Sequence, residues 1–168
     1  MRGPQRDGEF EEAFDELFPR AQRLAYRVLG NWLAAEDVAA EALARACLSW
    51  PKLRNAPWRD GWVLRVATNL ALDTAKRKRP EPSPPRNIDA EDAAVLRMAM
   101  LEALERLPRR QRQVLALRFL SDLSEADVAA ALHISAGSVK THTSRGLATL
   151  RRQLGPDMEE VPLALNGT

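Results

Sequence analysis

One segment near the middle of the chain most constrains its fold. Residues 79–87 read Arg-Pro-Glu-Pro-Ser-Pro-Pro-Arg-Asn, with four prolines within six positions. Because proline lacks a backbone N–H and restricts the residue before it, this segment cannot lie inside a helix. Proline-rich segments of this kind form extended, semi-rigid linkers. The chain of 168 residues is therefore predicted to divide into two parts, each the size of a small domain.

Both parts have the composition and periodicity of helices. Apolar residues make up 45% of the chain and aromatic residues only 5%. Alanine and leucine dominate the apolar residues, and runs of β-branched residues are rare. That balance favours helices over strands. The predicted fold class is all-α, with two small helical domains joined by a Pro-rich linker. Helices are expected from near the N-terminus to Gly30, and at about 35–50, 58–78, 92–107 and 110–120, with a loop from Pro51 to Pro57.

The charges follow this division of the chain. Residues 1–79 carry 14 Lys and Arg against 11 Asp and Glu, and residues 101–155 carry 9 against 5, whereas the linker region and the C-terminal end are net acidic. Two basic domains fit a nucleic-acid partner, although ordinary surface charge explains the pattern equally well. The predicted boundaries are a first domain at 10–79, a linker at 80–92, a second domain at 93–154 and a flexible acidic tail at 155–168.

The second half contains the pattern of a helix-turn-helix. Ser124 is placed to cap a short helix, and Asp127 follows it at the spacing of a capping box. A tight turn from His133 leads to Ser135, which can cap a longer helix over residues 136–154. That helix has an apolar face and an opposite polar, basic face, which suits a DNA major groove about 12 Å wide. The alternative is a plain helical hairpin with a solvated charged face.

The sequence shows no pattern for catalysis or metal binding. The single cysteine, Cys47, excludes a disulfide framework and a four-cysteine zinc site. The two histidines, His133 and His142, are nine residues apart with no carboxylate motif between them. We expect a protein that is not an enzyme and has no cofactor or metal. With neither a signal peptide nor a membrane-spanning stretch of about 18 apolar residues, a soluble cytoplasmic protein is expected.

Taken together, the two parts resemble the bacterial RNA polymerase sigma factors of the extracytoplasmic-function class, over residues 10–80 and 95–154. The stretch Ala-Glu-Asp-Val-Ala-Ala-Glu-Ala at 35–42 is similar to the core-binding helix of this family, and its acidic start is favourable beside the positive end of a helix dipole. The resemblance implies core RNA polymerase as a partner, contacted at the clamp helices of its largest subunit. The residues that would make this contact are Glu36, Asp37 and Glu41.

Residues 62–73, Trp-Val-Leu-Arg-Val-Ala-Thr-Asn-Leu-Ala-Leu-Asp, match the helix that opens promoter DNA at the −10 element in this family. The resemblance implies that the preceding loop, about 53–59, holds a flipped base. Trp58 and Trp62 could stack on bases, although tryptophans at the start of a helix more often pack in a core. The residues implied to hold the opened strand are Arg65, Asn69, Lys76 and Arg77.

Residues 107–112, Leu-Pro-Arg-Arg-Gln-Arg, and the helix-turn-helix after them resemble the domain that reads the −35 element. Gly146 stands where the family commonly has alanine, at a cost of about 1 kcal/mol in a helix interior. The implied recognition positions are Lys140, Thr141, His142, Ser144 and Arg145, and the implied phosphate contacts are Arg109, Arg112 and Arg118.

The resemblance implies a sigma factor that binds core polymerase and directs promoter-specific transcription initiation, with promoter DNA and an anti-sigma protein as further partners. The main alternative is a stand-alone helix-turn-helix repressor or activator. That alternative leaves the first domain without a role, and no dimerisation heptad is visible for reading a palindrome. A second alternative is a helical adaptor that binds proteins and no DNA.

Overall fold

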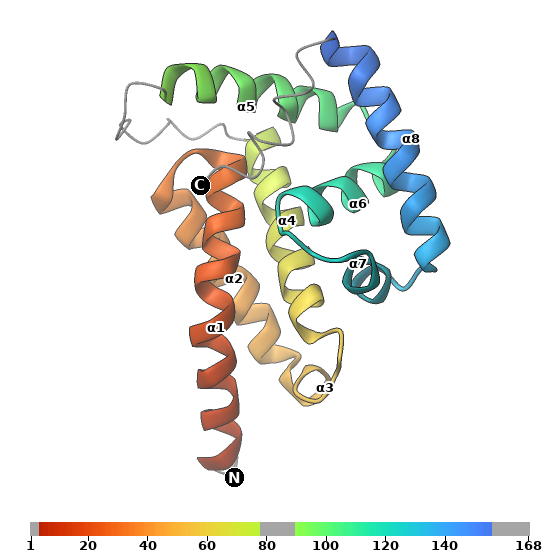
Figure 1. Ribbon diagram of the computed structural model, residues 1–168. Helices are drawn as coiled ribbons and strands as arrows, with labels where there is room; N and C mark the ends of the chain where they lie inside the picture. The colour runs from red at the N-terminus through yellow and green to blue at the C-terminus, as the bar shows by residue number, and fades with distance from the viewer. Residues whose placement is uncertain (1–3, 78–89, 156–168) are drawn as a thin grey trace.

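The computed structural model describes residues 4–77 and 90–155, and every regular element in these residues is an α-helix (Figure 1). Most of the predicted proline-rich linker and almost all of the predicted acidic tail lie outside the described residues. Helix α5 begins at Ala90, so the last three positions of the predicted linker are helical. The helices are α1 (Pro4–Leu29), α2 (Trp32–Leu48), α3 (Trp50–Leu53), α4 (Arg59–Arg77), α5 (Ala90–Glu105), α6 (Arg109–Phe119), α7 (Glu125–Leu132) and α8 (Ala136–Leu154).

Helix α2 begins three residues earlier than the sequence predicts. Gly30 ends α1 with φ +63°, a left-handed conformation that favours glycine. Asn31 then caps α2, because its side-chain oxygen accepts a hydrogen bond from the backbone N–H of Ala34 at 2.9 Å. The Trp32 ring stacks on Tyr26 at 3.9 Å between centroids and fixes this start. Glu36 therefore lies beyond the first turn, and the predicted interaction of the acidic residues with the helix dipole is wrong.

The expected loop after α2 contains a short helix instead. Pro51 does close the long helix, but it lies in the first turn of α3. That position tolerates proline because the first N–H groups of a helix have no intrahelical partner. The side chains of Trp50 and Leu53 of α3 are buried in the core of the first domain. The chain then turns back into α4, so α3 determines where the loop before α4 lies.

The helix-turn-helix is confirmed in detail. Ser124 Oγ accepts a hydrogen bond from the backbone N–H of Asp127 at 3.1 Å, and the Asp127 carboxylate accepts one from the backbone N–H of Ser124 at 3.3 Å. These two bonds form the predicted capping box. Ser135 caps α8 in the same way, accepting from the Ser138 N–H at 3.0 Å. His133 ends α7 in a left-handed conformation, with φ +54°.

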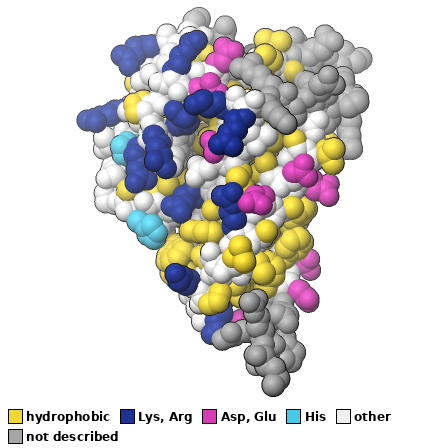
Figure 2. Space-filling view, turned by 180° about the vertical axis from the view of Figure 1, so that it is seen from behind, with side chains coloured by type: hydrophobic (Ala, Val, Ile, Leu, Met, Phe, Trp, Pro, Cys, Tyr) yellow, Lys and Arg dark blue, Asp and Glu magenta, His cyan; other side chains and the backbone are white. Residues whose placement is uncertain are grey.

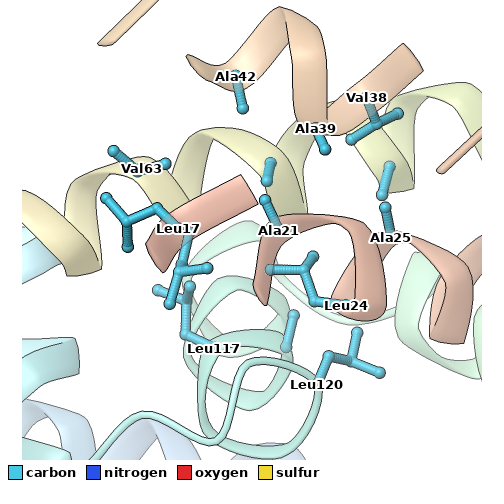
Figure 3. Packing of buried hydrophobic residues seen from close by; sticks show 14 of the residues in the cluster. Leu17, Ala21, Leu24, Ala25, Val38, Ala39, Ala42, Val63, Leu117 and Leu120 are labelled. Atoms are coloured by element: carbon cyan, nitrogen blue, oxygen red, sulfur yellow. The ribbon is translucent and has the colours of Figure 1, made fainter. Parts of the chain in front are cut away.

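The first domain packs α1, α2 and α4 around small residues. Four alanines at this contact, Ala21 and Ala25 on α1 and Ala39 and Ala42 on α2, have no exposed surface (Figure 3). Because alanine adds only one carbon, the helix backbones approach one another closely.

In the second domain a separate cluster that includes Met100, Leu104, Leu107, Leu115 and Leu150 joins α5, α6 and α8.

The two domains also pack directly on each other, which the sequence did not predict. Leu17 and Leu24 of α1 belong to the same buried cluster as Leu117 and Leu120 of the second domain (Figure 3). Helix α4 lies against both α6 and α7, as Figure 1 shows. The molecule is thus two helical domains whose larger hydrophobic core continues from one domain into the other.

Candidate nucleic-acid interface

Helix α8 presents a polar, basic face to solvent. Val139 and Leu150 on its inner face are buried, whereas the outer side chains are exposed. Thr141 is held in place because its hydroxyl donates a hydrogen bond to the Gly137 carbonyl at 3.0 Å. His142 lies at the edge of this face and is half-buried. The structure thus brings the predicted recognition residues together along one helix, with Lys140, Thr141, Ser144 and Arg145 exposed.

A basic depression continues this face toward the end of α8. Arg145, Arg151 and Arg152 line it together with Gln111 of α6. Arg152 donates a hydrogen bond to the Thr149 hydroxyl at 3.1 Å. In Figure 2 the Lys and Arg side chains are most numerous toward the α8 side of the molecule, with a few Asp and Glu among them. The sequence does not indicate Gln111 as a site residue, because only the packing of α6 on α8 brings its side chain to this face.

Two of the three predicted phosphate contacts are used within the second domain. Arg112 donates to the carbonyls of Glu105 and Leu107 at 3.0 and 3.1 Å, and so caps the end of α5. Arg118 donates to the Leu123 carbonyl at 2.6 Å. Both side chains are half-buried, whereas Arg109 is exposed. The positions of Arg112 and Arg118 favour a structural role, because their guanidinium groups satisfy backbone carbonyls that a helix end and a turn leave open.

The predicted −10 face of α4 is only partly exposed. Lys76 and Arg77 face solvent, but Arg65 and Asn69 are half-buried. Burial lowers the pKa of Arg65 below its ordinary value, and the nearby charge of Arg110 in the second domain lowers it further. An arginine stays cationic despite such a shift. The expectation that this face points outward is therefore correct for its C-terminal end alone, because the second domain lies against its middle.

The loop before α4 borders a cavity of about 430 Å³. The Asp60 carboxylate contacts Arg59 at 2.8 Å and Arg20 of α1 at 3.3 Å, and the second pair holds the start of α4 against α1. Trp58 is half-buried, and its ring meets the His133 ring edge-on at 5.6 Å between centroids. The far wall of the cavity comes from the second domain, through Leu123, Asp127 and Ala130.

Helix α2 carries the predicted acidic residues on its exposed side. Glu36, Asp37 and Glu41 all face solvent, and Glu41 pairs with Arg45 at 2.7 Å. Sequence reasoning missed the apolar side chains exposed on the same helix. Leu33 near its start is 71% exposed and Leu48 at its end is 86% exposed. The two leucines lie at opposite ends of the helix and do not form one continuous apolar patch, so their exposure alone does not mark an interface.

Two negative findings hold for residues 4–77 and 90–155. None of their helices has the length and hydropathy needed to cross a membrane. Nor do these residues place three or more His, Cys, Asp or Glu side chains where they could hold a metal ion.

Comparison with known proteins identifies the family. Residues 13–81 match the family Sigma-70 region 2, and residues 97–150 match Sigma-70, region 4. The chain is 30% identical to the ECF RNA polymerase sigma factor SigW of Bacillus subtilis over an alignment 169 positions long, which covers 86% of this chain and 88% of that protein. The chain belongs to the extracytoplasmic-function class of the sigma-70 family. It is therefore a transcription initiation factor, not an enzyme, from a family that binds RNA polymerase.

Further matches agree with this assignment. The sigma factor is also 30% identical to the RNA polymerase sigma-E factor of Streptomyces coelicolor, over 87% of this chain and 86% of that protein. Its fold is similar to that of CnrH, solved in complex with the cytosolic domain of CnrY, with a TM-score of 0.63 and coverage of 88% of both chains. Because the two chains are only 19% identical, this likeness concerns the fold alone.

Proposed function

We propose that this sigma factor docks on core RNA polymerase through α2 and reads the promoter with both domains. In this proposal α8 binds the −35 element in the major groove, and α4 with the loop before it captures bases of the −10 element. The observation that carries the proposal is the outer face of α8, where Lys140, Ser144 and Arg145 are exposed on a helix whose opposite face is buried.

For the −35 element, α8 offers both kinds of contact that recognition needs. Arg145 and Lys140 can donate to guanine edges, and the hydroxyls of Thr141 and Ser144 can approach bases closely. Phosphate contacts position the helix without reading sequence. We assign that part to the exposed Arg109 and to the arginines that line the depression beside α8.

For the −10 element, α4 and its loop combine charge with a recess. A single strand is held by a cationic surface together with a place for unstacked bases. Arg65, Asn69, Lys76 and Arg77 lie along α4 in that order, and they would contact the opened strand and its phosphates. The cavity bordered by Trp58 would receive a flipped base. Trp62 is packed against the core, and we assign it no contact with DNA.

For the polymerase, the exposed side of α2 offers acidic residues between two apolar ends. We propose that Glu36, Asp37 and Glu41 face basic residues of the clamp helices in the largest subunit, while Leu33 and Leu48 pack at the two ends of the contact. An anti-sigma protein would be a second partner, because the structural neighbour CnrH was solved with CnrY bound.

Transcription in vitro tests the proposal as a whole. Core polymerase with this protein should give discrete run-off transcripts from genomic fragments that neither component gives alone. Replacing Lys140 and Arg145 by alanine should weaken promoter binding by roughly 1–3 kcal/mol for each base that the helix no longer recognises. Arg23→Ala removes an exposed charge on α1 and serves as the control. Tight binding to a palindromic site without polymerase would instead favour a stand-alone repressor or activator.

The polymerase contact can be tested separately. Glu41→Gln should lower the affinity for core polymerase by about tenfold, as expected when one partner of a close charge pair at an interface is neutralised. The loss of the Glu41–Arg45 pair within α2 should cost less than about 0.5 kcal/mol, so the fold should be unaffected. Glu11→Gln neutralises an exposed acid on α1 and is the matched control. Equal polymerase affinity for both variants would remove Glu41 from the contact.

A further inference from the structure

The basic depression beside the end of α8 carries positive charge that no carboxylate near it offsets. It has a volume of about 530 Å³, and its three arginines, Arg145, Arg151 and Arg152, are exposed at one edge of the molecule (Figure 1). Within residues 4–77 and 90–155, no carboxylate forms an ion pair with any of the three. Charges of one sign in a recess attract an anionic partner. We call this feature the α8 depression.

Hydrogen bonds hold one of these arginines in place. The Thr149 hydroxyl donates to the Arg145 carbonyl at 3.1 Å, and Arg152 donates to the Thr149 oxygen at 3.1 Å. A guanidinium group has five N–H donors, so most of those on Arg152 remain for a ligand. Planar guanidinium groups pair well with carboxylates and phosphates. The α8 depression therefore suits either kind of anion.

The chain that follows α8 supplies carboxylates directly. Gly155 ends the helix with φ +71°, and its N–H donates to the Arg151 carbonyl. Residues 156–168 contain Asp157, Glu159 and Glu160 and no Lys or Arg. Carboxylates just beyond the end of a helix are unfavourable beside the negative end of its dipole. Pairing with the arginines of the last turn of α8 would offset that cost.

The acidic residues are within reach of the whole depression. Five extended residues, the number from Gly155 to Glu160, span at most about 17 Å. At about 1.5 Å per residue along a helix, Arg145 lies about 15 Å back from Gly155. Single exposed ion pairs contribute little to stability. A short tether nevertheless gives the segment an effective concentration in the millimolar range, which makes a contact of several weak pairs possible.

We propose that the α8 depression is a binding site for an acidic peptide, and that in the free protein it is occupied by residues 157–160 of the same chain. There the segment competes with DNA phosphates. This second step rests on the proposed function, which assigns phosphate contacts to the same arginines. Because phosphate contacts carry no sequence information, the bound segment lowers the affinity for DNA of any sequence.

Nuclear magnetic resonance tests the contact without DNA. The test variant carries Asp157→Asn, Glu159→Gln and Glu160→Gln in the full chain. Compared with the native chain, its ¹H–¹⁵N spectrum should show shifted backbone amides at residues 145–152 and unchanged amides in α1 and α2. The matched control neutralises three exposed acids of α1, through Glu11→Gln, Glu12→Gln and Asp15→Asn. It changes the net charge equally and should leave the amides of α8 where they are.

DNA binding tests the competition. The probe is a duplex of about 20 base pairs of arbitrary sequence, because sequence-independent binding depends on phosphates. At about 50 mM salt the tail variant should bind it about tenfold more tightly than the native chain, as expected if the segment occupies the depression about nine-tenths of the time. The α1 control should differ from the native chain by less than about twofold, since its charges lie away from the depression and are screened.

A variant of the depression completes the test. In a chain with Arg151→Gln and Arg152→Gln, DNA binding should be weaker overall. Neutralising residues 157–160 in this background should change the affinity by less than about twofold, because the segment has lost its site. A tenfold gain that persists in this background would overturn the proposal.

The remaining outcomes also decide. Tighter DNA binding without shifts at residues 145–152 would mean that the acidic residues repel DNA from a distance, and the proposed site would be wrong. Shifts around the exposed Val95 and Met98 of α5 instead would place the segment on another surface. Unchanged spectra and DNA affinity would overturn both steps. If the protein gives no promoter-specific transcripts with core polymerase, the proposed function fails, whereas the spectral shifts at α8 would still establish the peptide site.

Discussion

Gly146 sets how closely α8 packs on α6. A Cβ atom at this position would lie 2.7 Å from Cδ1 and 3.1 Å from Cγ of Leu115, and the Leu115 side chain is itself only 1% exposed. From the sequence alone, a glycine in the middle of a helix is expected to lower the stability of the helix by about 1 kcal/mol relative to alanine. The structure gives the reason for it, because the missing side chain makes room for Leu115 in the core of the second domain.

At the scale of this residue, Gly146→Ala should lower stability even though alanine is the better helix former. The gain in helix propensity is about 1 kcal/mol, whereas forcing an extra methyl into a packed core costs about 1–3 kcal/mol. A net loss of about 1 kcal/mol in the free energy of unfolding is expected, measured by denaturant titration. Gly137→Ala is the control, because Gly137 lies in the same helix with only Ser135 Oγ near, at 3.8 Å. Equal stabilisation by both substitutions would contradict this expectation.

At the scale of the element, α7 depends on its cap. It has only eight residues, and helices this short are marginal without help from their ends and their packing. Ser124→Ala removes the acceptor for the Asp127 N–H and should destabilise the second domain by about 1 kcal/mol. Ser124→Asn keeps an acceptor at the same place and should retain most of the stability. Thermal unfolding of the two variants side by side measures the difference, and unchanged stability in Ser124→Ala would show that the cap contributes little.

The ends of the helices also show what a sequence can predict. Helix α8 has the predicted bounds, 136–154, because Ser135 caps it and Gly155 ends it, and both signals are local. The start of α2 was misplaced because its determinants include the stacking of Trp32 on Tyr26, a contact between two helices. The implied phosphate contacts of Arg112 and Arg118 show a similar limit, because the sequence does not reveal their bonds to backbone carbonyls. Their charge is visible in the sequence, but the carbonyls that they satisfy are brought near only by the fold.

At the scale of the whole molecule, the sequence predicts two helical domains but not their contact. Apolar periodicity indicates which face of a helix is buried, and it does not indicate what covers that face. Leu117 and Leu120 fit equally well in a core of their own domain and in one shared with α1, where the structure places them. The half-burial of Arg65 follows from this contact, so a surface that the family resemblance implies to be open is partly covered.

The fit between the domains gives a prediction for the molecule as a whole. The nearest atoms to a Cβ on Gly61 all belong to α7, at 3.0–3.9 Å. Gly61→Leu should therefore leave the first domain folded, since leucine favours the helix, while its side chain pushes α7 away. Small-angle scattering should show a larger radius of gyration, with an unchanged helical signal in circular dichroism. Gly8→Leu is the control, because a Cβ there meets no atom within 4 Å. If the Gly61→Leu protein is as compact as the control, the contact tolerates a side chain at this position. The close approach of α4 and α7 would then not be what holds the domains together.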